Sequence, residues 1–156
     1  MIINIIAAVG KNLELGKDNK LIWPIKEDLI YFKEKTLNKT VVMGKNTFYS
    51  IGKALPNRNN IVLTSGNIDV DNIKVLHDYK EIFNLEDEEI YIIGGESIYK
   101  LFLPYADNLY LTEIESEEPK ADSYFPIFDK NNYEKELIKK SNNNELEYSF
   151  VRYRKK

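Results

Sequence analysis

The sequence has 156 residues, of which 43% are hydrophobic and 30% charged, with a formal net charge of −3. The length favours one domain covering residues 1–156, and the acidic balance offers no basic surface for nucleic acid. The absence of cysteine excludes disulfides, thiolate catalysis and cysteine-based zinc sites, and it suits a reducing compartment such as the cytoplasm. We expect no metal site.

The apolar start of the chain predicts a buried strand at Ile2–Val9. This run lacks the basic residues of a signal peptide, and Asn4 interrupts it, so we expect no targeting segment. No apolar run approaches the length of a membrane-spanning helix, so we expect no membrane partner.

The next element is a helix at Lys26–Thr36, and its spacing raises a question about Asp28. At 100° per residue, an apolar stripe expected to face the core contains Ile25, Leu29, Phe32 and Thr36. The opposite face carries Glu27, Ile30 and Glu34. Asp28 falls at the edge of the apolar stripe. It is either an exposed acid favoured by the helix dipole in the first turn, or a buried acid with a function.

Further along the chain, short β-branched runs alternate with helical stretches. We expect strands at Thr40–Met43, Asn60–Thr64, Lys74–His77, Glu89–Ile93 and Asn108–Ile114, and helices at Asn46–Ile51, Tyr79–Asn84 and Glu96–Leu103. The runs Tyr133–Lys140 and Leu146–Arg154 flank an Asn-rich turn and predict a hairpin. The pattern indicates an α/β fold with a mostly parallel sheet and an antiparallel C-terminal edge hairpin.

Two junctions, Val41–Phe48 and Ile90–Tyr99, pass from an apolar strand through glycine into a helix. Free N–H groups at a helix start attract anions, and glycine lets the backbone approach a bound group closely. Two such junctions on neighbouring strands could hold a pyrophosphate, with Lys45 as a nearby cation. Alternatively the glycines only turn the chain. Neither junction matches the G-x-G-x-x-G or P-loop fingerprints, so an ordinary Rossmann or NTPase site is not indicated.

Two hydroxyl residues, Thr64 and Ser65, follow the strand that contains Leu63. Hydroxyls in place of an acid, with Lys45 nearby, suit a nucleotide that carries a 2′-phosphate. The alternative is an ordinary turn, where Ser and Thr are common. The only histidine, His77, is placed at a strand end and is expected to have no catalytic role.

Several motifs occur together in a fixed order over nearly the whole chain. They are Ile6-Ala-Ala8, Leu15-Gly16, Leu21-Ile-Trp23, Asp28–Lys33, Val42–Phe48, Ser50-Ile-Gly52, Leu55–Arg58, Ile93-Gly-Gly95, Tyr99 and Tyr110-Leu-Thr112. In that order and spacing the chain resembles a bacterial dihydrofolate reductase. The resemblance implies an eight-stranded, mostly parallel sheet flanked by about four helices. It also implies NADPH-dependent reduction of 7,8-dihydrofolate to 5,6,7,8-tetrahydrofolate, with hydride transfer to pterin C6 and protonation at N5, in support of one-carbon metabolism.

The resemblance gives Asp28 a role as the pocket carboxylate that pairs with the amino group and N3 of the pterin. Burial should raise its pKa above the usual value of about 3.9. Thr112 is implied as the residue that orients Asp28, and Leu21 and Trp23 belong to the same catalytic group. Arg58 is implied to bind the α-carboxylate of the glutamate tail, for which its bidentate fork is suited. The other implied substrate contacts are Ile6, Ala8, Leu29, Phe32, Ser50, Ile51, Leu55, Ile93 and Tyr99.

For NADPH, the resemblance assigns both glycine junctions, the adenosine end and a loop over the nicotinamide. The junction and adenosine positions are Gly44, Lys45, Asn46, Thr47, Leu63, Thr64, Ser65, His77, Ile93, Gly94, Gly95, Glu96, Ser97, Ile98 and Tyr99. The remaining positions are Ala8 and, in the loop, Leu15, Gly16, Asn19, Lys20 and Leu21. The Gly94–Gly95 peptide is expected to be cis, as is usual in the family.

Four residues depart from the family pattern, namely Ile22, Lys53, Ser97 and Ala121, where proline, arginine, a basic residue and glycine are common. None removes the chemistry of Asp28. One alternative is a fold-related reductase acting on a ribosylated pyrimidine, and Asp28, Arg58 and Thr112 argue against it because that substrate has no pterin edge or glutamate tail. Another is a silent binding protein that keeps the fold. We expect a monomer that binds dihydrofolate and antifolate inhibitors.

Overall fold

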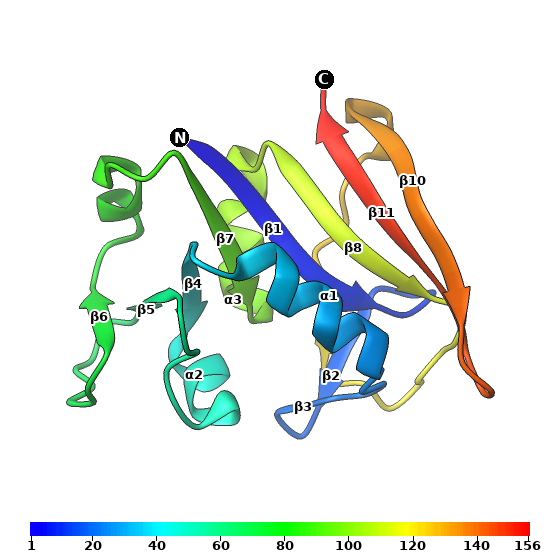
Figure 1. Ribbon diagram of the computed structural model, residues 1–156, viewed down its shortest axis with the longest axis horizontal. Helices are drawn as coiled ribbons and strands as arrows, with labels where there is room; N and C mark the ends of the chain where they lie inside the picture. The colour runs from blue at the N-terminus through cyan, green and yellow to red at the C-terminus, as the bar shows by residue number, and fades with distance from the viewer.

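The computed structural model describes residues 1–156 and centres on one large sheet (Figure 1). Its strands are β1 (Ile2–Val9), β4 (Thr40–Gly44), β5 (Asn59–Leu63), β6 (Ile73–Leu76), β7 (Glu89–Gly94), β8 (Asn108–Ile114), β10 (Tyr133–Asn142) and β11 (Glu147–Lys155). The spatial order is β10-β11-β8-β1-β7-β4-β5-β6. All pairings among β1 and β4–β8 are parallel, whereas β11 runs antiparallel to both β8 and β10. The predicted sheet is therefore confirmed.

Helices cover both faces of this sheet. The α-helices are α1 (Lys26–Thr36), α2 (Lys45–Ile51) and α3 (Glu96–Phe102), and short 3-10 helices occur at η1 (Tyr79–Asn84), η2 (Leu103–Tyr105) and η3 (Lys130–Asn132). In Figure 1, α1 lies in front of β1 and β8, and α3 lies behind the sheet. The element expected to be helical at 79–84 is thus a 3-10 helix, since the segment holds only six residues between the Asp78 cap and extended Leu85.

Side chains along β1 point alternately to the two faces of the sheet and join a different core cluster on each face. Ile3 and Ile5 join a cluster with Phe102 of α3, whereas Ile6 joins a second cluster with Phe48 of α2 and Tyr110 of β8. A strand that is buried on both faces is mostly apolar, and in β1 the one polar residue is Asn4. This two-sided burial fixes the sheet on which the candidate site is built.

Three residues of the predicted apolar stripe of α1 face the core, since Ile25 and Thr36 are buried and Phe32 packs against a core cluster. Tyr31 packs against Phe150 with ring centroids 4.5 Å apart, and the Lys35 ammonium lies 4.2 Å from the Tyr110 ring centre. Leu29, expected to face the core, is 50% exposed, and Glu27, expected to face solvent, contacts the C-terminal hairpin. The stripe was therefore wrong at Leu29 only. Tyr31 and Lys35 also cover the sheet, because Tyr and Lys can cover apolar surface with their long stems while keeping their polar ends hydrated.

A second, small sheet was not predicted. It contains β2 (Glu14–Lys17), β3 (Lys20–Leu21) and β9 (Ser123–Tyr124), in the order β3-β2-β9. The turn between β2 and β3 places Asp18 and Asn19 at φ 52° and 61°. Asp and Asn tolerate positive φ, so this pair is the sequence signal for the hairpin.

No helix of the structure combines the length and the apolar character needed to cross a bilayer.

Candidate functional site

The shortest hydrogen bond between α1 and the sheet joins Asp28 to Thr112. The Thr112 hydroxyl on β8 donates a 2.5 Å hydrogen bond to Oδ1 of Asp28. Thr112 is buried and lies beside Ala8 of β1 in the register of the sheet. Burial raises the pKa of Asp28, the hydrogen bond from Thr112 opposes that rise, and the charge of Glu27 adds to it. The site therefore holds a carboxyl group that takes up a proton more readily than an exposed aspartate.

Two tyrosines surround this carboxyl group. The Tyr99 hydroxyl donates a 2.8 Å hydrogen bond to the carbonyl of Ile6, and burial, with a smaller effect of Asp28, raises the pKa of Tyr99. Burial, with contributions from Tyr110 and Asp28, also raises the pKa of Tyr31 to about 12. Both phenols stay neutral at physiological pH, which leaves Asp28 as the one carboxylic acid of the three, with a pKa raised by burial.

Arg58 is held half-buried at the other end of α1 without an anionic partner. Its Nε donates to the Pro56 carbonyl at 2.8 Å, and its Nη1 donates to Oγ1 of Thr36 at 3.1 Å. Desolvation lowers the pKa of Arg58, and no carboxylate lies within ion-pair distance. A guanidinium with donors to spare and no counter-ion is suited to bind a carboxylate ligand.

The two glycine junctions lie side by side, because β4 and β7 are parallel neighbours in which Met43 is opposite Gly94. The helices α2 and α3 begin after Gly44 and Gly95, and no side chain accepts a hydrogen bond from the free N–H groups at either start. A Cβ on Gly95 would lie 3.3 Å from Oγ1 of Thr47. The first turns of α2 and α3 thus open onto the same edge of the sheet. The Gly94–Gly95 peptide is cis, and Gly94 has a φ of 127°.

The neighbouring strands bring the predicted adenosine residues to this same edge. Leu63 is opposite Gly44 on one side and Leu76 on the other. Thr64 then follows directly, and its carbonyl lies 2.9 Å from Nδ1 of His77. In open α/β sheets, ligands bind outside the carboxyl ends of the strands, and these residues occupy that position.

The remaining predicted residues lie in three surroundings. Ile6 and Ile93 are buried in one core cluster, with Phe32 and Leu55 packed against it. Leu15, Ile98 and Tyr99 belong to the α3 side of the core, and Ala8 and Trp23 to a third cluster. Gly16 is also buried. Solvent-exposed positions are Asn19, Lys20, Leu21, Leu29, Lys45, Asn46, Ser50, Ile51, Ser65, His77, Glu96 and Ser97.

Some predicted residues are committed to contacts inside the protein. The Ser50 hydroxyl donates to the carbonyl of Asn19 at 2.6 Å, and thereby ties α2 to the turn between β2 and β3. Glu96 Oε1 accepts a 2.8 Å hydrogen bond from the Tyr124 amide of β9. Glu27 was missed by the sequence analysis, because its partners lie more than 100 residues away and no local pattern points to them.

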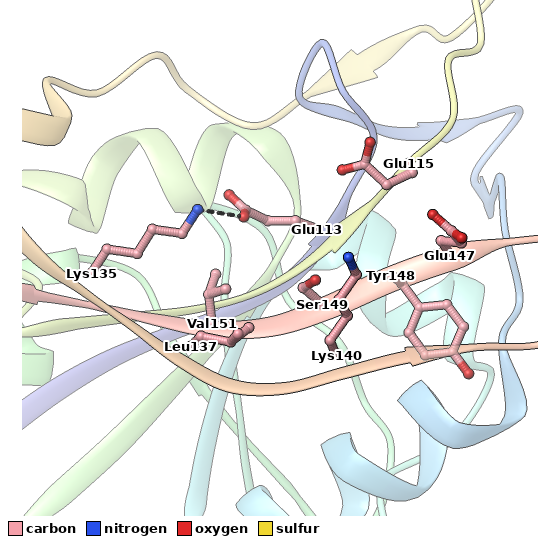
Figure 2. Close-up of a pocket in the computed structure, with 9 residues that line it drawn as sticks. All are labelled: Glu113, Glu115, Lys135, Leu137, Lys140, Glu147, Tyr148, Ser149 and Val151. Carbon is pink, nitrogen blue, oxygen red and sulfur yellow. Dashed lines mark ion pairs between the residues drawn. The ribbon is translucent and has the colours of Figure 1, made fainter.

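A shallow hollow of about 460 Å³ lies elsewhere, over β8, β11 and β10 (Figure 2). It is lined by Glu113, Glu115, Lys135, Leu137, Lys140, Glu147, Tyr148, Ser149 and Val151. Adjacent strand residues point to opposite faces, so Glu113 lies on the face away from Thr112 and Asp28. None of the predicted site residues lines this hollow.

Comparisons with known proteins agree with this geometry. A family model described as dihydrofolate reductase matches residues 2–155. A dihydrofolate reductase from Bacillus subtilis is 39% identical over 160 residues, covering 99% of this chain and 95% of the relative. One from Buchnera aphidicola is 43% identical, covering 96% and 97%.

Among solved structures, a dihydrofolate reductase from Enterococcus faecalis complexed with NADP(H) and RAB-propyl superposes with a TM-score of 0.91. It is 32% identical and covers 99% of this chain and 96% of its own. The matched length, the shared eight-stranded fold and the arrangement of Asp28, Thr112 and the glycine junctions lead to one conclusion. The chain belongs to the dihydrofolate reductase family.

Proposed function

We propose that this chain reduces 7,8-dihydrofolate to 5,6,7,8-tetrahydrofolate with NADPH, using Asp28 as its single site carboxylate. The observation that carries the proposal is the hydrogen bond from buried Thr112 of β8 to Asp28 of α1. The reaction consumes one proton, because dihydrofolate gains a hydride and a proton while NADPH becomes NADP⁺.

Asp28 is suited to recognise the pterin edge. Thr112 satisfies one oxygen of its carboxylate, and the amino group and ring N–H of a pterin would satisfy the rest. A partly desolvated carboxylate gains most from such charge-assisted bonds. The raised pKa of Asp28 also keeps a proton available near the heterocycle at higher pH than an exposed aspartate could.

The residues of the two junctions fit NADPH. The uncapped starts of α2 and α3 offer backbone N–H groups, and Lys45 is exposed beside them. Thr64, Ser65 and His77 extend the same edge and would accept the 2′-phosphate of the adenosine. Bound NADPH supplies the hydride. The protein's part is to hold the two ligands together, with Ile93, Ala8 and Tyr99 beside the nicotinamide and the hairpin of β2 and β3 covering it.

Arg58 would bind the glutamate tail of the substrate. It has no counter-ion in the protein, and Thr36 and Pro56 fix its guanidinium in place. Leu29, Ile51, Phe32 and Leu55 would line the path from Asp28 to Arg58. Leu29 and Ile51 are 50% and 37% exposed, so both side chains are accessible to a ligand.

We further propose that the protein acts as a single-domain monomer in the cytoplasm and that antifolates bind beside Asp28. One family match over residues 2–155 supports a single domain. The outer strand β10 carries charged side chains paired within the chain, a pattern that discourages edge-to-edge association. The absence of cysteine suits the cytoplasm. The net charge of −3 disfavours nucleic acid as a partner.

The direct test mixes the protein with NADPH and dihydrofolate and follows the loss of cofactor absorbance. Asp28→Asn should lower turnover at neutral pH, whereas Arg58→Leu should raise KM for dihydrofolate. A protein that binds NADPH but does not oxidise it with dihydrofolate would instead be a silent relative of the family.

A further inference from the structure

One carboxylate joins the first turn of α1 to the C-terminal hairpin. Oε1 of Glu27 accepts hydrogen bonds from the Ser141 hydroxyl at 2.6 Å and the Tyr148 hydroxyl at 2.8 Å. Oε2 accepts a 2.8 Å hydrogen bond from the ammonium of Lys139. These bonds, that of Lys139 first, lower the pKa of Glu27 to about 2, so the group is ionised at any working pH. Glu27 adjoins Asp28 and is thus a fixed negative charge beside the proposed catalytic acid.

The arrangement depends on an irregularity in β10. The register between β10 and β11 shifts between Leu137 and Lys139, so that Ile138 is an extra residue. Figure 2 shows Leu137 and Lys140 on the face that bears Glu113, with the ring of Tyr148 turned the other way, toward α1. Regular alternation would put residues 137, 139 and 141 on one face. The bulge instead turns Lys139 and Ser141 to the α1 side, where Ser141 is the cross-strand partner of Tyr148.

The charged and titratable groups near Asp28 come from four parts of the fold. Glu27 and Tyr31 belong to α1 itself, and Tyr99 belongs to α3. On the sheet side, neutral Thr112 donates to the carboxylate, and Lys139 and Tyr148 of the hairpin act through Glu27. Because Tyr31 and Tyr99 remain neutral, Glu27 and Lys139 are the nearby ionised pair.

We propose that Glu27 is a positioning residue for the reduction. It fixes the first turn of α1 against the hairpin and, together with Lys139, sets the electric field at Asp28. The inference rests on the proposed function, since it concerns the acid used in that reaction. It adds that the pair of Asp28 and Thr112 is not sufficient for the reaction. The chemistry of Asp28 depends on a hairpin that lies outside the residues assigned to either ligand.

The test compares the pH profile of turnover, at saturating NADPH and dihydrofolate, for two variants. One removes a negative charge near Asp28 and the other removes a positive charge. Turnover falls as pH rises because a proton is consumed, and the midpoint of that fall reports Asp28. Glu27→Gln removes the adjacent negative charge, so the midpoint should move to lower pH. Lys139→Met leaves Glu27 without its cation, so the midpoint should move to higher pH. We expect each shift to be on the order of half a pH unit, and the double variant to lie between the two.

Two matched variants separate charge from structure. Tyr148→Phe removes one hydrogen bond to Glu27 without changing any charge, and its midpoint should equal that of the parent protein. Glu134→Gln removes an exposed carboxylate from the same strand, where it pairs with Arg154, and it should also leave the midpoint unchanged. Thermal unfolding of all variants shows which of them have lost stability.

The proposal is overturned if Glu27→Gln and Lys139→Met shift the midpoint in the same direction or not at all, even where both lower turnover at every pH. It is also overturned if Tyr148→Phe shifts the midpoint as far as the charge variants do. These failures differ from failure of the proposed function. In that case, the parent protein would not oxidise NADPH with dihydrofolate, or Asp28→Asn would match its turnover across the profile.

Discussion

Asp28 combines burial with a single neutral hydrogen-bond donor inside the protein, and both properties bear on activity and stability. Burial disfavours the charged form, and Thr112 supplies only part of what water would. The unbound protein therefore holds an incompletely satisfied carboxyl group. Such a group is costly in a fold and useful in a site, because a ligand can complete its hydrogen bonds.

We expect Asp28→Asn to lower turnover at pH 7 by about 10²–10⁴-fold, the range for loss of a general acid or base. NADPH affinity should be unchanged, because Asp28 does not belong to the cofactor residues. Activity should recover partly at low pH, where solvent supplies the proton. The pH dependence of NADPH oxidation measures this, and full turnover of the variant at neutral pH would remove Asp28 from the mechanism.

The same substitution should stabilise the protein. The native state keeps the proton of Asp28 to a higher pH than the unfolded chain, whose aspartate titrates near 3.8. Stability therefore falls as pH rises from that value through the raised pKa, and the loss persists at neutral pH. Asparagine still accepts the bond from Thr112 and has no charge to desolvate. A gain of about 1 kcal/mol would raise Tm by about 2–4 °C at pH 7, with no gain near pH 3.

We expect Arg58→Leu to raise KM for dihydrofolate by about 10–100-fold, as for loss of a hydrogen bond to a charged group. The value of kcat should change little, since the tail is bound equally in the ground and transition states. Arg58→Lys keeps the charge without the fork and should lie between the two. Steady-state kinetics at varied dihydrofolate decide the point, and a fall in kcat at constant KM would contradict a tail-binding role.

At the scale of elements, the small sheet is fastened to the rest of the chain by Glu14. Glu14 is buried, its Oε1 accepts from the Asn12 amide at 2.8 Å, and its Oε2 accepts from the Glu118 amide at 2.7 Å. It thus links β2 to the segment after β8. Further backbone bonds, such as that from the Phe125 amide to the Leu13 carbonyl, join the same two regions.

Glu14→Ala should therefore destabilise the fold by about 2–4 kcal/mol, because it leaves two amides without acceptors, at about 1–3 kcal/mol each. Urea unfolding measures the difference. Glu115→Ala is the control, since Glu115 is exposed and pairs with Lys11 only at 3.9 Å; its effect should be below about 1 kcal/mol. If both variants lost the same free energy of unfolding, the two hydrogen bonds to Glu14 would not stabilise the fold more than an exposed ion pair does.

Elements with a strong local signal were predicted well, and those set by distant contacts were not. The β-branched runs identified β1, β4, β5 and β7 because those strands are buried on both faces. The predicted face of α1 was right for Ile25, Phe32 and Thr36 and wrong for Leu29. Tyr31 and Lys35 cover the sheet as well, which the apolar pattern does not indicate. The bulge at Ile138 and the anchoring of Glu27 had no local signal at all. The partners of Glu27 are 112–121 residues away along the chain.

At the scale of the whole molecule, the proposed site lies at the carboxyl edge of the sheet, where the ends of several parallel strands come together. The parallel order β7-β4-β5-β6 brings Gly94, Gly44, Thr64 and His77 to that edge. Sequence reasoning alone proposed two glycine junctions on neighbouring strands, and the pairing of β4 with β7 makes them neighbours. The individual ligand contacts stay predictions, because the residue types alone also suit ordinary turns.

Cofactor binding should stabilise the molecule as a unit. NADPH at 100 times its Kd adds about 2.7 kcal/mol to the free energy of unfolding, which raises Tm by roughly 5–10 °C for a chain of this length. NADH at the same concentration should raise Tm less, since it lacks the phosphate proposed to contact Thr64 and Ser65. Thermal scans with each nucleotide test this, and equal shifts would remove those residues from nucleotide selection.

The extra residue at Ile138 makes the length of β10 matter as much as its composition. Deleting Ile138 would restore unbroken alternation and leave Lys139 opposite Phe150 and Ser141 opposite Tyr148, on the side of Glu27. Deleting Lys140 instead would absorb the extra residue by moving Lys139 opposite Ser149, on the far side of the hairpin from Glu27. No residue assigned to either ligand would have been replaced. The second deletion would then disturb proton uptake at Asp28, whereas the first would not.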